Sequence, residues 1–166
     1  SSETRSPDNQ PLQRLAITGS SGYLGRQLIE AFRKRASALR ILGLDLREPG
    51  LAGPDEFVRG DILRPDLGEI LRAFAPDTII HAAFAFQPSH DERRMRQVNV
   101  EGARNVLQAA AAIRPARLLV VSSATAYGAW PDNPVPMDES WPLRARSTFR
   151  YAGDKTDVEQ ELAQFA

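Results

Sequence analysis

The sequence contains no cysteine and only two histidines, His81 and His90. Disulfide bonds and thiolate metal sites are therefore excluded, and no metal site is predicted, because no spacing of the other possible ligands supports one. No apolar run approaches the roughly 18 residues that a membrane-spanning helix needs. The 21 basic and 21 acidic side chains give a formal net charge of zero, which offers no general attraction to nucleic acid or to an anionic membrane. We expect a cytoplasmic protein that binds neither.

The length of 166 residues predicts one domain, and the composition at its beginning predicts a polar leader. Residues 1–12 are polar and contain two prolines, which is typical of a disordered leader. Over residues 13–166, short apolar runs alternate with amphipathic segments. Strands are expected at 15–18, 39–45, 56–58, 78–83 and 117–122, helices at 22–35, 67–74, 91–113 and 147–166, and a proline-rich loop at 128–143. Near-continuous apolar strands that alternate with helices predict a doubly wound, Rossmann-like parallel α/β sheet with helices on both faces.

Three glycines separate the first expected strand from the first expected helix. Gly19 allows a tight turn, Gly22 lets the backbone approach a pyrophosphate, and Gly25 lets the helix pack close to the sheet. The start of the helix, with Tyr23 and Leu24, offers free N–H groups and a partial positive charge to the phosphates. An ordinary glycine-rich turn would share this spacing, but its position after the first strand favours a dinucleotide site.

An acidic residue, Asp45, ends the second expected strand, 20 residues beyond Gly25. Its carboxylate can accept both hydroxyls of the adenosine ribose and would repel a 2′-phosphate, which predicts NAD rather than NADP. Arg47 is the counter-argument, because an arginine at this place could pair with a 2′-phosphate.

A phenol and an ammonium lie four residues apart at Tyr151 and Lys155, so on a helix they face the same way. A phenol with a pKa of about 10 is a poor base, and a nearby ammonium stabilises the phenolate. Ser123 follows the fifth strand, at the edge where open α/β sheets bind ligands, and could orient a substrate carbonyl. The three residues predict proton transfer during hydride exchange with a nicotinamide, although a surface Tyr–Lys pair and a capping serine are the simpler explanations of each part.

These residues lie in the motifs TGSSGYLG (18–25), GLDLR (43–47), GDI (60–62), PDTIIHAAF (76–84), VNVEGARNVLQAA (98–110), VVSSATAYG (120–128) and YAGDK (151–155). Together they resemble the extended short-chain dehydrogenase/reductase family, which contains NAD-dependent sugar epimerases and dehydratases. The resemblance implies that Ser123, Tyr151 and Lys155 are catalytic and that Lys155 also holds the nicotinamide ribose. It further implies cofactor contacts by Asp61 and Ile62 at the adenine, by Ala82 and Ala83 at the pyrophosphate and ribose, and by Asn99 nearby.

The sequence departs from that family in two informative ways. The family's chain normally continues into a substrate-binding domain of about 150 residues, and this sequence ends before it. Sugar dehydratases of the family carry an Asp–Glu pair where Ala124 and Thr125 stand here, so water elimination is disfavoured. The resemblance therefore implies a nucleotide-sugar 4-epimerase. A simple NAD(P)-dependent reductase or dehydrogenase of a small carbonyl compound and a cofactor-sensing module without turnover are the alternatives. Members often dimerise through helices that here would span 91–113 and 147–166, which implies a homodimer.

Overall fold

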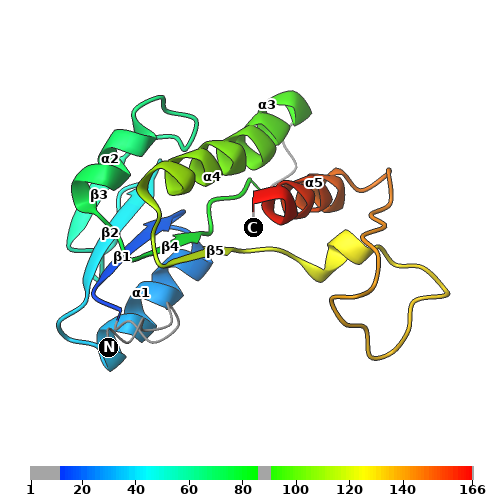
Figure 1. Cartoon of the computed structure of the whole chain (residues 1–166), viewed down its shortest axis with the longest axis horizontal. Coiled ribbons are helices and arrows are strands. Elements are labelled where there is room, and N and C mark those ends of the chain that lie inside the picture. Colours follow the sequence, from blue (N-terminus) through cyan, green and yellow to red (C-terminus); the bar gives the residue numbers. More distant parts are fainter. Residues whose placement is uncertain (1–11, 86–90, 166) are drawn as a thin grey trace, which may run out of the picture.

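The computed structural model describes residues 12–85 and 91–165, and a single parallel sheet lies at its centre (Figure 1). The strands are β1 (Arg14–Thr18), β2 (Arg40–Asp45), β3 (Glu56–Arg59), β4 (Thr78–His81) and β5 (Arg117–Val120). They are ordered β3-β2-β1-β4-β5, so the chain reverses direction across the sheet after β3. This order confirms the doubly wound α/β fold that the sequence predicts.

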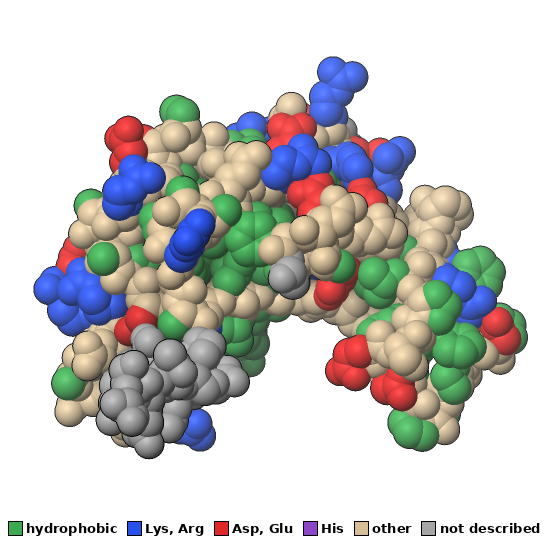
Figure 2. Space-filling model, in the orientation of Figure 1, with side chains coloured by type: hydrophobic (Ala, Val, Ile, Leu, Met, Phe, Trp, Pro, Cys, Tyr) green, Lys and Arg blue, Asp and Glu red, His purple; other side chains and the backbone are tan. Residues whose placement is uncertain are grey.

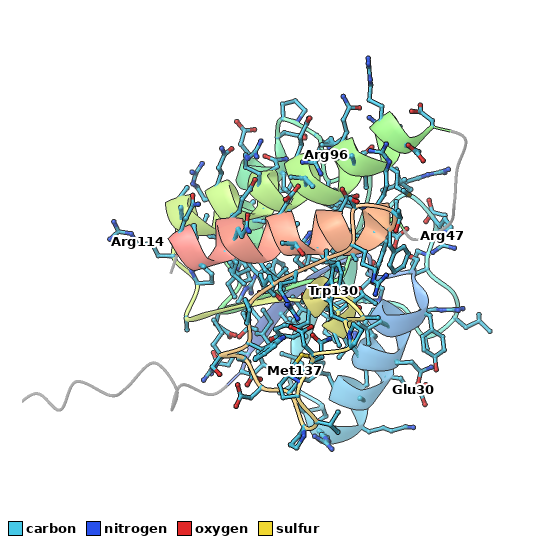
Figure 3. The ribbon with its side chains drawn as sticks, turned by 90° about the vertical axis from the view of Figure 1, so that its right-hand side faces the viewer. Glu30, Arg47, Arg96, Arg114, Trp130 and Met137 are labelled. Atoms are coloured by element: carbon cyan, nitrogen blue, oxygen red, sulfur yellow. The ribbon has the colours of Figure 1, made fainter. Side chains whose placement is uncertain are left out.

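Helices connect and cover the strands. They are α1 (Tyr23–Arg35), α2 (Leu67–Phe74), α3 (Glu92–Arg96), the π-helical turn η2 (Gln97–Glu101), α4 (Gly102–Ile113), the 3₁₀ turn η3 (Ala124–Tyr127) and α5 (Arg150–Phe165). In Figure 3, α5 lies alongside α4, and α1 lies on the other side of the sheet. Residues 128–149 form the proline-containing loop, which projects away from the sheet in Figure 1.

Element boundaries differ from the expected ones at several ends. The helix expected over 91–113 is interrupted by the π turn η2, which inserts a wider turn between α3 and α4. The last helix begins at Arg150 rather than at residue 147, and β4 and β5 each end two residues before the expected end. The expected leader lies outside the described residues except for Leu12, which packs against the core.

Two apolar clusters hold the layers together, one on each face of the sheet. On one face, α2 and α4 bury Leu67, Leu71 and Val106 against Leu42 and Ile79. On the other face, α1 buries Ile29 against residues of β1, β2 and β4. Because both faces are covered there, β1, β2 and β4 are buried at successive positions, as predicted, whereas the edge strands β3 and β5 are partly exposed. No helix in the described part of the chain is long and apolar enough to cross a membrane.

The starts of β1, β4 and β5 are joined through Asp77. Its Oδ2 accepts hydrogen bonds from the N–H groups of Gln13 (2.7 Å) and Arg14 (2.8 Å). Its own N–H donates to the carbonyl of Arg14 (3.0 Å), and its carbonyl accepts from the N–H of Arg117 (3.1 Å). The side chain thus adds two charge-assisted bonds to the backbone ladder at the edge opposite to the glycine turn.

We predict that Asp77→Ala lowers the free energy of unfolding by about 2 kcal/mol, because two backbone N–H groups lose their acceptor. Asp77→Asn retains an acceptor oxygen and should cost less than half as much. Urea denaturation measures both values, and an Asp77→Ala protein as stable as the wild type would contradict the assignment.

Candidate active site

The turn between β1 and α1 is packed so closely that it accepts no side chain at two of its glycines. Gly19 has a φ of 76°, and a Cβ on it would lie 2.6 Å from the backbone nitrogen of Ala83. A Cβ on Gly25 would lie 2.2 Å from the carbonyl oxygen of Gly19. Gly22 precedes α1, no side chain caps this helix end, and its first turn holds no acidic residue. The backbone N–H groups there are therefore available to an anion.

A groove of about 260 Å³ opens beside this turn. It is bounded by β2 and by the segments that follow β3 and β4. The predicted cofactor residues that line it are Gly19, Gly22, Asp45, Asp61, Ile62, Ala82 and Ala83. Since the groove runs from an uncapped helix end to two carboxylates, these residues fit a dinucleotide with its pyrophosphate at the helix and its adenosine at the acids.

The other predicted cofactor residues lie around the groove. Tyr23 and Leu24 are exposed at the start of α1, and Gly25 lies beneath the turn. Asn99 is fully buried in the π turn and is hydrogen-bonded to the backbone of Ala85, which lines the groove.

Asp45 is held in place by the backbone. Its carboxylate accepts hydrogen bonds from the N–H groups of Ser21 and Arg47, both at 3.0 Å. Its side chain is only 10% exposed, whereas Arg47, which also lines the groove, is 73% exposed and has its Nε 3.9 Å from Asp45 Oδ1. Figure 3 labels Arg47 near the start of α1. A fixed carboxylate at this place accepts hydroxyl groups and repels a phosphate.

Tyr151 and Lys155 meet at the ring of Phe84. The Lys155 ammonium lies 3.6 Å from the centroid of that ring and donates to the carbonyl of Val121. The ring of Tyr151 packs edge-on against Phe84 with 5.3 Å between centroids, and the Lys155 ammonium lies 5.9 Å from the Tyr151 centroid. Phe84 also lines the groove, so Tyr151 and Lys155 both pack against a residue of its wall.

Burial changes the ionisation of two groups at this place. It lowers the pKa of Lys155 to about 8, partly opposed by the charge of Glu159. Burial and then the Lys155 charge lower the pKa of His81 to about 4, so this ring is neutral near pH 7. His81 shares a hydrogen bond of 2.7 Å with the hydroxyl of Thr18, which places it inside the sheet end.

Ser123 begins the turn that packs against α5. Its Oγ accepts from the hydroxyl of Thr125 at 2.9 Å and caps η3, so the capping role considered for this serine is present. The η3 turn contacts α5, and the hydroxyl of Thr156 donates to the carbonyl of Ala126. The structure therefore places Ser123 at the start of η3, which packs against α5, the helix that carries Tyr151 and Lys155.

Two residues in this region were not predicted from the sequence. Phe84 lies in a quoted motif, but its contact with both Tyr151 and Lys155 is visible only in the fold. Asp154 is buried on α5, and no periodicity marks it, since an acidic residue on a helix is ordinarily exposed.

The tryptophans of the loop pack around an arginine. The guanidinium of Arg144 lies 5.4 Å from the ring centroid of Trp141 and 5.8 Å from that of Trp130, and it forms an ion pair with Asp132. Figure 2 shows this loop as a lobe separated from the rest by a concave surface.

Residues 15–166 match the family described as the NAD dependent epimerase/dehydratase family. The chain belongs to this family. Membership confirms the resemblance drawn from the motifs.

Known relatives agree with this membership. The sterol-4-alpha-carboxylate 3-dehydrogenase of Candida albicans is 28% identical over 93% of this chain and 46% of its own length. The Bordetella bronchiseptica enzyme WbmG, solved with NAD and UDP, is 27% identical with a TM-score of 0.77, over 92% of this chain and 50% of its own. The UDP-glucose 4-epimerase of Thermus thermophilus, solved with NAD, is 26% identical with a TM-score of 0.76. The match covers 92% of this chain and 50% of the epimerase chain. The chain thus spans about half the length of the relatives it matches.

We predict that Gly25→Ala weakens NAD⁺ binding at least about tenfold, because the new methyl group displaces the carbonyl of Gly19 and with it the turn. Gly153→Ala is the matched control, since a Cβ there meets nothing within 4 Å. It should leave binding unchanged and raise the free energy of unfolding by up to about 1 kcal/mol, because alanine favours a helix interior. Calorimetric titration and urea denaturation test both variants, and equal NAD⁺ affinity in the two would contradict the packing argument.

We also predict that Lys155 titrates with a midpoint near pH 8. The chain has only two lysines, so lysine-selective ¹³C labelling gives one signal for Lys155 and one for the exposed, ion-paired Lys34 as a reference. Because the pKa is lowered in the folded state, this group costs stability below about pH 8, and stability rises as pH increases from there towards the unfolded value. A Lys155 midpoint above about pH 10 would contradict its burial.

Proposed function

We propose that this chain binds NAD and supplies the proton-transfer groups of an oxidoreductase that acts on a secondary alcohol or ketone. The observation that carries this proposal is the meeting of Tyr151 and Lys155 at Phe84, on the border of the groove that begins at the glycine turn. NAD, when bound, accepts or returns a hydride at its nicotinamide ring.

Each of the three polar groups has a distinct role in this proposal. Tyr151 takes the proton from the substrate hydroxyl during oxidation and returns it during reduction. Lys155 is mostly protonated near pH 7, so its positive charge stabilises the phenolate and binds the nicotinamide ribose. Ser123 donates a hydrogen bond to the substrate oxygen and orients the carbon that exchanges the hydride.

NAD is favoured over NADP by the position of Asp45. Its carboxylate is fixed by two backbone N–H groups and lines the groove where the adenosine ribose would lie. The solved relatives named above hold NAD, which supports the same choice. Asp61 and the backbone of Ile62 would receive the adenine, and Ala82 and Ala83 the pyrophosphate and ribose.

A nucleotide sugar that is transiently oxidised at C4 is the substrate class that we favour. The similarity to a UDP-glucose 4-epimerase and to an enzyme solved with UDP supports it. Ala124 and Thr125 bring no acid or base for water elimination, which argues against a dehydratase. A simple reductase or dehydrogenase, which interconverts a small carbonyl compound and its alcohol, is the second candidate. The similarity to a sterol dehydrogenase over most of the chain supports this type of reaction. The homodimer through α4 and α5 stays a prediction.

We predict that Tyr151→Phe lowers single-turnover reduction of bound NAD⁺ by UDP-glucose at least about 100-fold, because the proton acceptor is lost. NAD⁺ affinity should change much less, since Phe retains the ring contact with Phe84. Nicotinamide absorbance in the full-length protein measures the reduction. Full turnover in the Tyr151→Phe protein would refute the mechanism, and wild-type turnover with a sterol carboxylate but not with UDP-glucose would favour the second candidate.

A further inference from the structure

A buried carboxylate lies next to Lys155 in sequence and has no part in the reaction described above. Asp154 is 3% exposed. Its Oδ1 accepts from Arg96 Nη1 and its Oδ2 from Asn99 Nδ2, both at 2.9 Å. The second arm of Arg96 pairs with Asp157 at 2.6 Å. Arg96 is the last residue of α3, and Figure 3 labels it on the helical segment that runs through η2 into α4.

The network continues from Asn99 into the wall of the cofactor groove. Asn99 Oδ1 accepts from the N–H of Ala85 at 2.7 Å, and its Nδ2 also donates to the carbonyl of Ala85 at 3.2 Å. Ala85 and the preceding Phe84 both line the groove. Asn99 belongs to the π turn, and its fully buried amide lies between α5 and the segment after β4, where it can bond to both.

The connections form a closed circuit. From α5 they run through Asp154 and Asn99 to Ala85, and from there through Phe84 back to α5 at Tyr151 and Lys155. Residues 154 and 155 point about 100° apart on a helix, so α5 is held on two sides of its axis at once. Such a circuit restrains both the rotation of α5 and its distance from the groove.

We propose that Asp154 is a positioning residue, which holds α5 through Asn99 so that Tyr151 and Lys155 keep their places at Phe84. The proposal rests on the function proposed above, in which these two side chains act on substrate and cofactor. Asp154 itself contacts neither and acts through its neighbours.

Asp154→Asn tests this with little change of volume. A carboxylate accepts from Arg96 and Asn99 through two oxygens, whereas an asparagine turns an NH₂ group towards one of these donors, so one bond is lost. Asp157→Asn is the matched control, because it removes the other partner of Arg96 without touching Asn99.

The readout is the ε-CH₂ signal of Lys155 in lysine-selective ¹³C spectra, together with NAD⁺ affinity by calorimetry. The ammonium lies 3.6 Å from the Phe84 centroid, so the ring displaces this signal from that of Lys34. In the Asp154→Asn protein we expect the signal to move towards that of Lys34 and NAD⁺ affinity to fall about tenfold. In the Asp157→Asn protein we expect both to stay as in the wild type.

The proposal is overturned if Asp154→Asn shifts only the urea midpoint while the Lys155 signal and NAD⁺ affinity stay at wild-type values, or if both variants behave alike. Arg96→Met removes the partly exposed donor and should show the same displacement to a smaller extent. If Asp154→Asn does not fold, the Arg96→Met protein tests the proposal in its place. Full turnover in the Tyr151→Phe protein would refute the proposed reaction but leave the positioning result standing, so the two failures are distinguishable.

Discussion

The close approach of the turn at Gly19 to the segment after β4 is the constraint on which the site depends. The N–H of Gly19 donates to the carbonyl of Leu44 at 2.8 Å, and Gly19 lies against the peptide between Ala82 and Ala83. The ends of β1, β2 and β4 thus meet at the turn, where no Cβ fits on Gly19. In the function that we propose, this close-packed backbone forms the floor under the pyrophosphate.

The second constraint is electrostatic. Lys155, to which we assign the positive charge that stabilises a phenolate, is almost fully buried. The carbonyl of Val121 and the face of Phe84 compensate part of the lost hydration, yet its pKa still falls to about 8. A pKa shifted by burial in this way is typical of functional sites.

Much of the fold and part of the site could be predicted from the sequence. Gly19, Gly22 and Gly25, and the acid at the end of the second strand, have local physical reasons for their residue types. The position of Gly19, Gly22 and Asp45 along one groove, with Gly25 packed beneath the turn, could therefore be predicted. Apolar runs likewise predicted the five described strands, and the predicted strand ends differ from the observed ones by up to two residues.

What could not be predicted depends on contacts between distant segments. The π turn at residues 97–101 was not predicted from the sequence, and in the fold it packs against α5. Asp154 and Phe84 are 70 positions apart, and only the crossing of α5 over the segment after β4 makes them parts of one network. Patterns of period 3.6 report which face is apolar, and a buried acid on that face escapes them.

Asp154 and Lys155 are adjacent in sequence but bind different partners. Side chains at successive positions of a helix point in different directions, so the carboxylate and the ammonium do not face each other. Here Arg96 and Asn99 bind the carboxylate, and within the described residues no carboxylate forms an ion pair with Lys155. The buried acid is therefore balanced by the partly exposed guanidinium of Arg96, and in the function that we propose the buried ammonium is left to act on the phenolate. A helix that carries both groups can be held firmly through one and act through the other.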